Sequence, residues 1–199
     1  RLIVLTGPRK AGKDKLRLYL KRNYRSFRDL RIADAVVKIA KVLEIEPERR
    51  VFHALFGVNH LLRPILGQSA YVRRIGIILE REKPSLALVQ AARTEEEYEE
   101  FVLKRKGVLI GIKADPKIRY ERAVADVTRL NEKRDEGQMS FKDFMGDPKK
   151  ETGEYSPIER EIAKIVDQAH FIVENNYRSP ALFYREIDKI MKTLGIKKK

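Results

Sequence analysis

The chain begins with a short apolar run that ends abruptly at a glycine and a proline. Leu2–Thr6 has the length and the β-branched content of a strand that is buried on both faces, and Gly7-Pro8 interrupts it. A helical pattern starts near Gly12, with Leu16 and Leu20 at helical spacing. The first twenty residues therefore predict a buried strand, a tight loop and a helix, in that order.

The loop between this strand and helix has the pattern G-x-x-x-x-G-K, from Gly7 to Lys13. Glycine at both ends allows backbone angles that a β-carbon would resist, so successive N–H groups can point inward around an anion. Lys13 adds a positive charge for the β- and γ-phosphates. The pattern predicts a nucleoside polyphosphate site, with ATP as the ligand. Its predicted binding residues are Gly7, Lys10, Ala11, Gly12, Lys13, Asp14 and Lys15.

The residue after the loop lysine differs from the usual pattern. Asp14 stands where a Ser or Thr commonly ligates magnesium. A carboxylate is also a hard oxygen ligand, so we expect Asp14 to hold Mg²⁺ directly or through water. Arg9 and Lys10 are expected either as surface charges of the loop or close to a phosphate.

Further apolar runs continue the alternation of strands and helices. Strands are predicted over 27–33, 85–91, 107–114 and 170–174, and helices over 35–43, most of 48–83, 95–105, 115 onward, 157–168 and 180–194. Thr94 and Glu97 form a capping box at the start of one helix. This order predicts an α/β fold with a parallel sheet and helices on both faces. Ligands of such sheets bind at the carboxyl ends of the strands, where the first loop lies.

Expectations for three local features follow from residue type and composition. Asp34 is expected to cap the helix that follows it, with a second acid near the phosphate loop as the alternative. Residues 126–156 are polar and almost without periodicity, which is typical of a functional flap or of disorder. The terminal lysines 197–199 are expected to fray.

Composition limits the remaining classes. With 199 residues and 43% hydrophobic content, one domain with one substantial core is expected. There is no apolar run of about 18 residues and no secretory leader, so a soluble cytoplasmic protein is expected. The absence of cysteine excludes disulfides, thiolate metal sites and a cysteine nucleophile. The three histidines are scattered and show no metal-ligand spacing.

The charge of the chain favours anionic partners. Lys and Arg number 43 against 29 Asp and Glu, which gives a net charge of +14. The positive charge is spread along the chain, with no basic run beyond the three terminal lysines and no glycine-aromatic motif. Binding of nucleic acid is therefore possible but not favoured over binding of nucleotides, and no membrane partner is expected.

Several strings, in order along nearly the whole chain, resemble P-loop nucleotide kinases, namely deoxynucleoside monophosphate kinases and relatives of dephospho-coenzyme A kinase. They are Lys10-Ala11-Gly12-Lys13-Asp14, Leu66-Gly67-Gln68-Ser69 with Arg73-Arg74, Arg93 with Glu96 and Glu97, Ala114–Arg122 and Ala169–Asn176. The resemblance implies the three-layer P-loop NTPase fold over residues 1–199. It also implies a helical substrate-binding insertion over 34–83 and a lid over 119–156.

The resemblance further implies roles for basic residues. Lys13, Arg93, Arg119 and Arg122 correspond to catalytic groups, whereas Gln68, Arg73 and Arg74 correspond to the substrate-binding side. For Arg119 and Arg122, surface ion pairs with Glu121, Asp126 and Asp135 are an equal alternative. For Arg73 and Arg74, a solvated helix face is an equal alternative. Asn175 and Asn176 are expected to form a turn that approaches the adenine.

The implied function is transfer of the γ-phosphoryl group of ATP, with Mg²⁺, to a nucleoside monophosphate or a nucleotide-like acceptor. One position departs from the family: Gln90 stands where relatives carry the Asp of D-G-x-R. The alternative is therefore a nucleotide-binding protein that has lost catalysis. A nucleic-acid-binding module is the third and least favoured possibility.

Overall fold

The fold comes from a computed structural model of the chain. The structure describes residues 1–24, 27–45, 64–66, 69–90, 92–130, 140–145, 157–177 and 179–199. Every predicted strand lies within these ranges, except for residue 91 at the end of the strand predicted over 85–91. Of the segment predicted as mostly helical over 48–83, residues 48–63, 67 and 68 lie outside them, and these include Gln68.

Five parallel strands form one sheet in the order β2-β3-β1-β4-β5. The strands are β1 (Leu2–Thr6), β2 (Phe27–Arg31), β3 (Leu86–Gln90), β4 (Val108–Lys113) and β5 (Phe171–Glu174). The first strand lies in the centre, and its apolar residues Ile3, Val4 and Leu5 are fully buried. The parallel sheet that the alternating pattern predicts is confirmed, and the phosphate loop follows its central strand.

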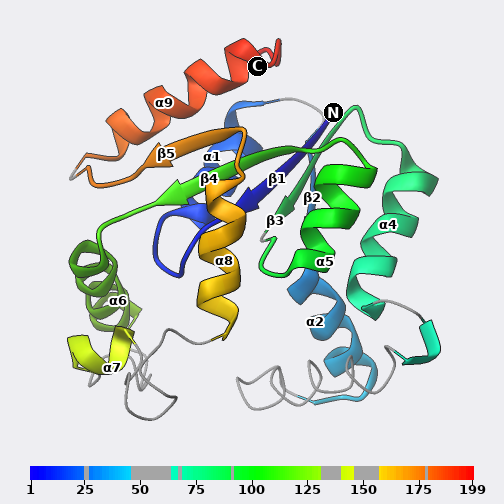
Figure 1. Cartoon of the computed structure of the whole chain (residues 1–199), viewed down its shortest axis with the longest axis horizontal. Helices are drawn as coiled ribbons and strands as arrows, with labels where there is room; N and C mark the ends of the chain where they lie inside the picture. Colours follow the sequence, from blue (N-terminus) through cyan, green and yellow to red (C-terminus); the bar gives the residue numbers. More distant parts are fainter. Residues whose placement is uncertain are drawn as a thin grey trace.

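Helices cover both faces of the sheet (Figure 1). They are α1 (Lys13–Asn23), α2 (Ile32–Val42), α4 (Ala70–Glu82), α5 (Glu95–Tyr98), the π-helix η1 (Glu99–Lys104), α6 (Pro116–Leu130), α7 (Phe141–Met145), α8 (Pro157–Asp167) and α9 (Pro180–Thr193). Residues 64–66 are helical as well.

The two faces of β1 supply two separate cores. Ile3 and Leu5 pack in one cluster with Leu16 of α1 and Phe183 of α9. Val4 points the other way, into a cluster with Ile75 of α4 and Phe101 of η1. This alternation along one strand builds the three layers and confirms the predicted fold class.

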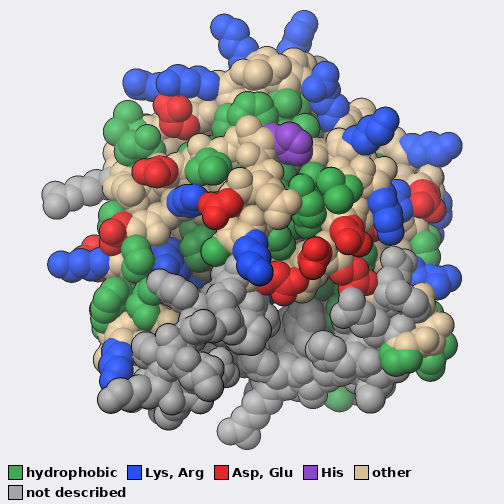
Figure 2. Space-filling model, in the orientation of Figure 1, with side chains coloured by type: hydrophobic (Ala, Val, Ile, Leu, Met, Phe, Trp, Pro, Cys, Tyr) green, Lys and Arg blue, Asp and Glu red, His purple; other side chains and the backbone are tan. Residues whose placement is uncertain are grey.

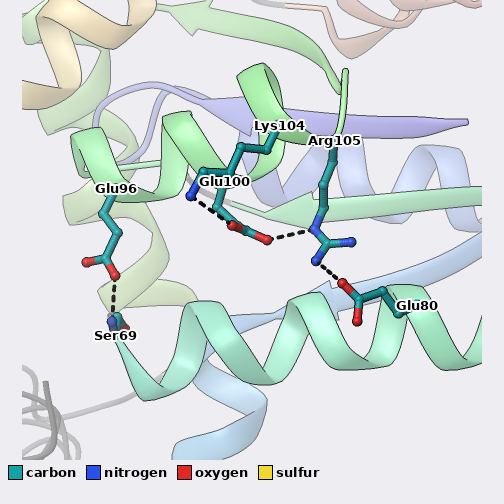
Figure 3. A network of polar contacts seen from close by, with 6 residues as sticks. All are labelled: Ser69, Glu80, Glu96, Glu100, Lys104 and Arg105. Carbon is teal, nitrogen blue, oxygen red and sulfur yellow. Dashed lines mark hydrogen bonds and ion pairs between the residues drawn. The ribbon is translucent and has the colours of Figure 1, made fainter. Parts of the chain in front are cut away.

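The helix predicted over 95–105 has two parts. Thr94 caps α5 with the expected capping box, in which its side chain accepts from the Glu97 N–H. After one turn the chain continues as the π-helix η1. Arg105 then links this segment to α4, because its guanidinium lies 2.8 Å from Glu100 and 2.7 Å from Glu80 (Figure 3). In the same view, the Ser69 N–H donates to Glu96 at the start of α4.

The predicted cap by Asp34 is wrong. Helix α2 begins at Ile32, so Asp34 lies inside its first turn, and Arg31 occupies the capping position without a side-chain bond. The Asp34 carboxylate instead forms an ion pair with Arg31 at 2.5 Å. The strand thus gives way to a helix two residues before the polar side chain that was expected to start it.

The described part of residues 126–156 is helical, so the expected disorder is wrong there, whereas the alternative of a functional flap stays a prediction. Helix α6 continues to Leu130, and α7 follows over Phe141–Met145. Phe144 is buried, with its ring 5.6 Å from that of Tyr120 on α6. Aromatic packing against α6 therefore orders a segment that has little periodicity of its own.

The terminal lysines do not fray. Lys198 pairs with Tyr24 in an isolated antiparallel bridge, and its ammonium contacts Asp188. Asp188 also accepts hydrogen bonds from the hydroxyls of Tyr19 and Tyr24, at 2.8 Å each. The tail is thereby held against α1 and α9. Within the described residues, no helix is both long and apolar enough to cross a membrane.

The link from α4 to η1 yields a stability prediction. Arg105→Met leaves the largely buried Glu100 carboxylate without its closest cation, and we expect it to lower the free energy of unfolding by about 1–3 kcal/mol. Lys104 approaches the same carboxylate only at 3.7 Å and is 66% exposed, so Lys104→Met is the matched control. That control is expected to change the free energy of unfolding by less than about 0.5 kcal/mol. Urea unfolding measures both, and equal effects would contradict the link.

Candidate active site

The phosphate loop lies close against the neighbouring strands. Gly7 has φ 137°, and a β-carbon there would lie 2.2 Å from the Ile112 carbonyl oxygen on β4. Gly12 has φ 121°, and a β-carbon there would lie 2.3 Å from the Asn175 amide nitrogen after β5. Both the backbone angle and the close approach therefore require glycine. The two glycines of the motif let the loop curve at the N-terminus of α1.

Lys13 lies at the centre of this curve. Its ammonium donates to the carbonyl oxygens of Gly7 at 2.5 Å and Pro8 at 2.7 Å, so the side chain folds back over the loop. Burial, with the positive charges of Arg93 and Arg119, lowers the pKa of Lys13 to about 7, although Asp14 opposes the shift. An anion beside such a lysine stabilises its charged form and raises its pKa again.

Arg93 and Arg119 come to this place from different elements. Arg93 lies three residues after the end of β3, and its N–H donates to the Glu97 carboxylate at 2.5 Å. Arg119 lies on α6 and is only 7% exposed, with its guanidinium 5.8 Å from the Phe144 ring. Both positive charges lower the pKa of Lys13, so Arg93 and Arg119 lie on the same side of the molecule as the phosphate loop and act on its lysine.

Arg122 contacts the backbone of the phosphate loop. Its guanidinium donates to the backbone carbonyls of Lys10 at 3.3 Å, Ala11 at 3.5 Å and Asn175 at 2.8 Å. The Asn175 side chain donates to the Ala11 carbonyl at 2.7 Å. Arg122 thus braces the outside of the phosphate loop, and it forms no ion pair with Glu121 or Asp126. Burial lowers the pKa of Arg122.

Asp14 meets Gln90 across the site. The Gln90 amide nitrogen donates to the Asp14 carboxylate at 2.6 Å, although the two residues lie 76 positions apart. The contact follows from the sheet, because Gln90 pairs in register with Leu5, just before the loop. Arg17 lies 3.8 Å from the same carboxylate. The position that departs from the family is therefore in contact with the predicted metal ligand.

The donor set fits Mg²⁺ only if the ligand shares in binding it. Among the described residues no group of three His, Asp or Glu side chains lies together as a metal site. Asp14 is a single carboxylate, and its side chain is 79% exposed. Mg²⁺ commonly binds through one or two carboxylates together with phosphate oxygens and waters, so this set is sufficient beside a polyphosphate.

A cavity of about 700 Å³ opens beside the loop. Lys15, the start of α6 and the turn after β5 line it, including Asn176 and Tyr177. The Asn176 side chain accepts from the Asp115 N–H at 2.8 Å, which fixes the turn against the start of α6. Its volume lies in the range of small-ligand sites, so the expected approach of the Asn175-Asn176 turn to a base has room there.

The other predicted residues lie apart from this cluster or outside the described part. Lys10 is paired with Asp126 at 3.0 Å, and Arg9 lies over the Phe144 ring at 4.1 Å. Arg73 and Arg74 line a different cavity, on α4. Gln68 lies outside the described residues.

Two contacts at the site were not predicted from the sequence. Glu97 was assigned to the capping box and to the motif with Arg93; in the structure it also accepts from the Arg93 N–H, and burial raises its pKa to about 7. Asn175 was expected only in a turn, yet it holds the loop at Ala11. The position of Glu97, four residues after Arg93, could have indicated its contact with the Arg93 backbone. No local sequence pattern pairs Asn175 with Ala11.

Similarity to solved structures agrees with this geometry. No protein-family model and no curated protein matches the chain. A shikimate kinase from Bacteroides thetaiotaomicron matches at 14% identity and a TM-score of 0.54, over 98% of each chain. TT1252 from Thermus thermophilus matches at 15% and 0.58, over 97% of each chain. A dephospho-CoA kinase from Campylobacter jejuni matches at 16% and 0.50, over 97% of this chain and 96% of its own. At these identities the matches show the fold alone, and the chain has the P-loop kinase fold.

The pKa of Lys13 predicts how ATP affinity depends on pH. Without a ligand, Lys13 loses its proton as the pH rises through about 7. A bound phosphate favours the charged form, so ATP binding above pH 7 requires uptake of a proton. We expect ATP affinity to fall between pH 7 and 9, by at most about tenfold per pH unit.

Calorimetric titration in two buffers of different ionisation enthalpy measures both the affinity and the proton uptake. Lys13→Arg is the matched control, because a guanidinium stays charged over this range. Its affinity should depend less on pH. A wild-type affinity that stays constant or rises from pH 7 to 9 would contradict the account of Lys13.

Proposed function

We propose that this chain binds ATP with Mg²⁺ and transfers the γ-phosphoryl group to a nucleotide-like small-molecule acceptor. The observation that carries the proposal is the glycine-bounded loop, with the Lys13 ammonium folded onto its Gly7 and Pro8 carbonyls. Arg93 and Arg119 act on Lys13 strongly enough to lower its pKa, so an anion of high charge beside Lys13 would be attracted to all three cations. The end of a nucleoside triphosphate is such an anion.

The loop supports binding of the donor phosphates. Gly7 and Gly12 pack against β4 and the turn after β5, and this close packing lets the loop curve at the N-terminus of α1, where backbone N–H groups can face an anion. The cavity beside Lys15 and Tyr177 offers space for the base. Arg122 and Asn175 keep the loop in its curved form before any ligand arrives, which lowers the cost of ordering it on binding.

The cations support stabilisation of charge during transfer. Phosphoryl transfer depends mainly on positioning and on neutralising the three equatorial oxygens of the moving group. Arg93 and Arg119 approach from β3 and α6, on either side of Lys13 in the strand order. Rigid, partly desolvated donors of this kind stabilise the transition state more than they stabilise the substrate.

Asp14 would hold Mg²⁺, which supplies neutralisation of the donor phosphates when bound. Gln90 keeps the Asp14 carboxylate in one orientation by donating to one of its oxygens. A strong base is not required in a loose transfer, so the amide at position 90 is compatible with turnover. Gln90 is therefore a positioning residue in this proposal.

Two structural neighbours support an acceptor of small size. Their names, shikimate kinase and dephospho-CoA kinase, denote kinases of small molecules. We extend this to a nucleotide-like acceptor for this chain because of the resemblance of its motifs, and we place the reaction in the cytoplasm, where ATP is available. The predicted insertion over 34–83 and lid over 119–156 remain part of this proposal.

A second candidate function is nucleotide binding without turnover. The observation that favours it is the amide at Gln90, which already donates to Asp14 in place of a free carboxylate at the end of β3. In that case ATP would stabilise the fold and no ADP would form.

Replacement of Lys13 tests the main proposal. We expect Lys13→Ala to reduce ADP formation by about a thousandfold, because it removes the central charge of the site. Lys21→Ala, an exposed lysine on the same helix, is the matched control and should leave activity unchanged. The assay is ADP release with a panel of deoxynucleotides, ribonucleotides and dephospho-coenzyme A. Turnover no higher than that of Lys13→Ala across the panel, together with stabilisation by ATP, would support the second function.

Replacement of Gln90 separates the two functions further. Gln90→Asp removes the donor and places a second carboxylate beside Asp14, and we expect turnover to fall about tenfold. Gln90→Asn keeps an amide and serves as the conservative control, with a smaller loss. Turnover of Gln90→Asp above that of the wild type would instead show that the natural chain is catalytically degenerate.

A further inference from the structure

A second concentration of positive charge lies away from the phosphate loop. Lys and Arg side chains are scattered singly over the face drawn in Figure 2, and acidic side chains gather near the start of α5. Elsewhere, basic side chains gather around a cavity of about 320 Å³ beside the edge strand β2. We call this cavity the edge groove. Five cations and one carboxylate line it: Arg28, Lys38, Arg73, Arg74, Arg81 and Glu82.

Pairing within the edge groove leaves most of this charge uncompensated. Arg28 engages Glu82 twice, at 2.6 and 3.1 Å, and lowers the pKa of that carboxyl. Arg81 reaches the same carboxylate at 3.5 Å. Lys38, Arg73 and Arg74 have no ion-pair partner among the residues that the structure describes. Three like charges around one concave surface repel each other, and a bound anion relieves that repulsion.

The spacing of the cations along α4 indicates the kind of anion. Arg74 and Arg81 lie seven residues apart, so they are about 10 Å apart along the helix axis and on one face. Ile77 lies between them, and its side chain is 49% exposed. A ligand that fits therefore carries anionic groups separated by less polar parts. A nucleic-acid strand, in which sugars and bases alternate with phosphates, has this character.

The edge groove is separate from the donor site in its lining. Its residues come from β2, α2 and α4, and none belongs to the phosphate loop, to the Arg93 segment or to α6. Among the described residues no strand pairs with the outer side of β2, so the groove lies at this edge of the sheet. A ligand there need not compete with ATP.

We propose that the edge groove binds the phosphate backbone of a short single-stranded nucleic acid, with Lys38, Arg73 and Arg74 as the main phosphate contacts. This assignment revises the expectation that Arg73 and Arg74 bind the acceptor of the kinase reaction. It also revises the view that positive charge is spread evenly, because the fold gathers residues that lie between positions 28 and 81.

Fluorescence anisotropy with a labelled eight-nucleotide oligouridylate tests the proposal on the full chain. Three phosphate contacts to a single strand predict a slope of log affinity against log salt of about −2. The variant Lys38→Gln/Arg73→Gln/Arg74→Gln should lose at least about tenfold in affinity and most of this slope. Arg22→Gln/Arg185→Gln/Lys192→Gln removes the same charge from exposed positions on α1 and α9 and should retain both.

Two further arms distinguish other ligands. Inorganic tripolyphosphate carries contiguous charges and should displace the oligonucleotide only at much higher phosphate concentration, whereas displacement at equal phosphate concentration would show a small-polyphosphate site. Lys13→Ala should bind the oligonucleotide as the wild type does. Loss of binding in that variant would place the strand at the phosphate loop and overturn the proposal.

Two results with the groove variant would overturn the proposal. Equal losses in the groove variant and in the control variant would show unspecific attraction by net charge. A raised acceptor KM with unchanged oligonucleotide affinity would return Arg73 and Arg74 to the acceptor site. Retained ATP stabilisation in the groove variant verifies that it is folded, and neither failure would bear on whether the phosphate loop binds ATP.

Discussion

The close contact of the β1–α1 loop with β4 and with the turn after β5 is the constraint on which the site depends. Gly7 lies against the Ile112 carbonyl, and Gly12 lies against the Asn175 amide, with no space for a side chain in either place. Arg122 and Asn175 then bind the outer carbonyls of the loop. With its carbonyls held from outside, the loop presents Lys13 and the N-terminus of α1 to a ligand.

Charge follows from this geometry. Lys13 is the cation that the loop itself offers to a phosphate. The fold adds Arg93 after β3 and Arg119 on α6, and these two charges lower the pKa of Lys13. The acid of the site lies on α1 as Asp14, and the strand opposite supplies the amide of Gln90 to orient it. The resemblance predicts a carboxylate where Gln90 stands at the end of β3. Asp14 on α1 is therefore the acid that would lie next to a bound Mg²⁺.

The sequence predicted the parts of the fold that depend on local pattern. The apolar runs, the two glycines of the loop and the capping box at Thr94 were sufficient for the parallel sheet, its helices on both faces and the position of Lys13. It did not predict features that depend on distant partners. Asn175 binds Ala11 from 164 residues away, and the polar α7 is ordered by packing of Phe144 on Tyr120. Arg122 was expected to contact phosphates or acids. Its bonds to backbone carbonyls were not predicted, because no sequence pattern indicates such a contact for a guanidinium.

The most direct measurement of the central claim is a crystal structure of the chain with a non-hydrolysable ATP analogue and Mn²⁺, in which anomalous scattering locates the metal. The account predicts the β- and γ-phosphates within hydrogen-bond distance of the Lys13 ammonium, the Mn²⁺ next to Asp14, and the base in the cavity lined by Asn176 and Tyr177. Phosphates bound along α4, or an analogue bound with Lys13 still folded onto the Gly7 and Pro8 carbonyls, would contradict it.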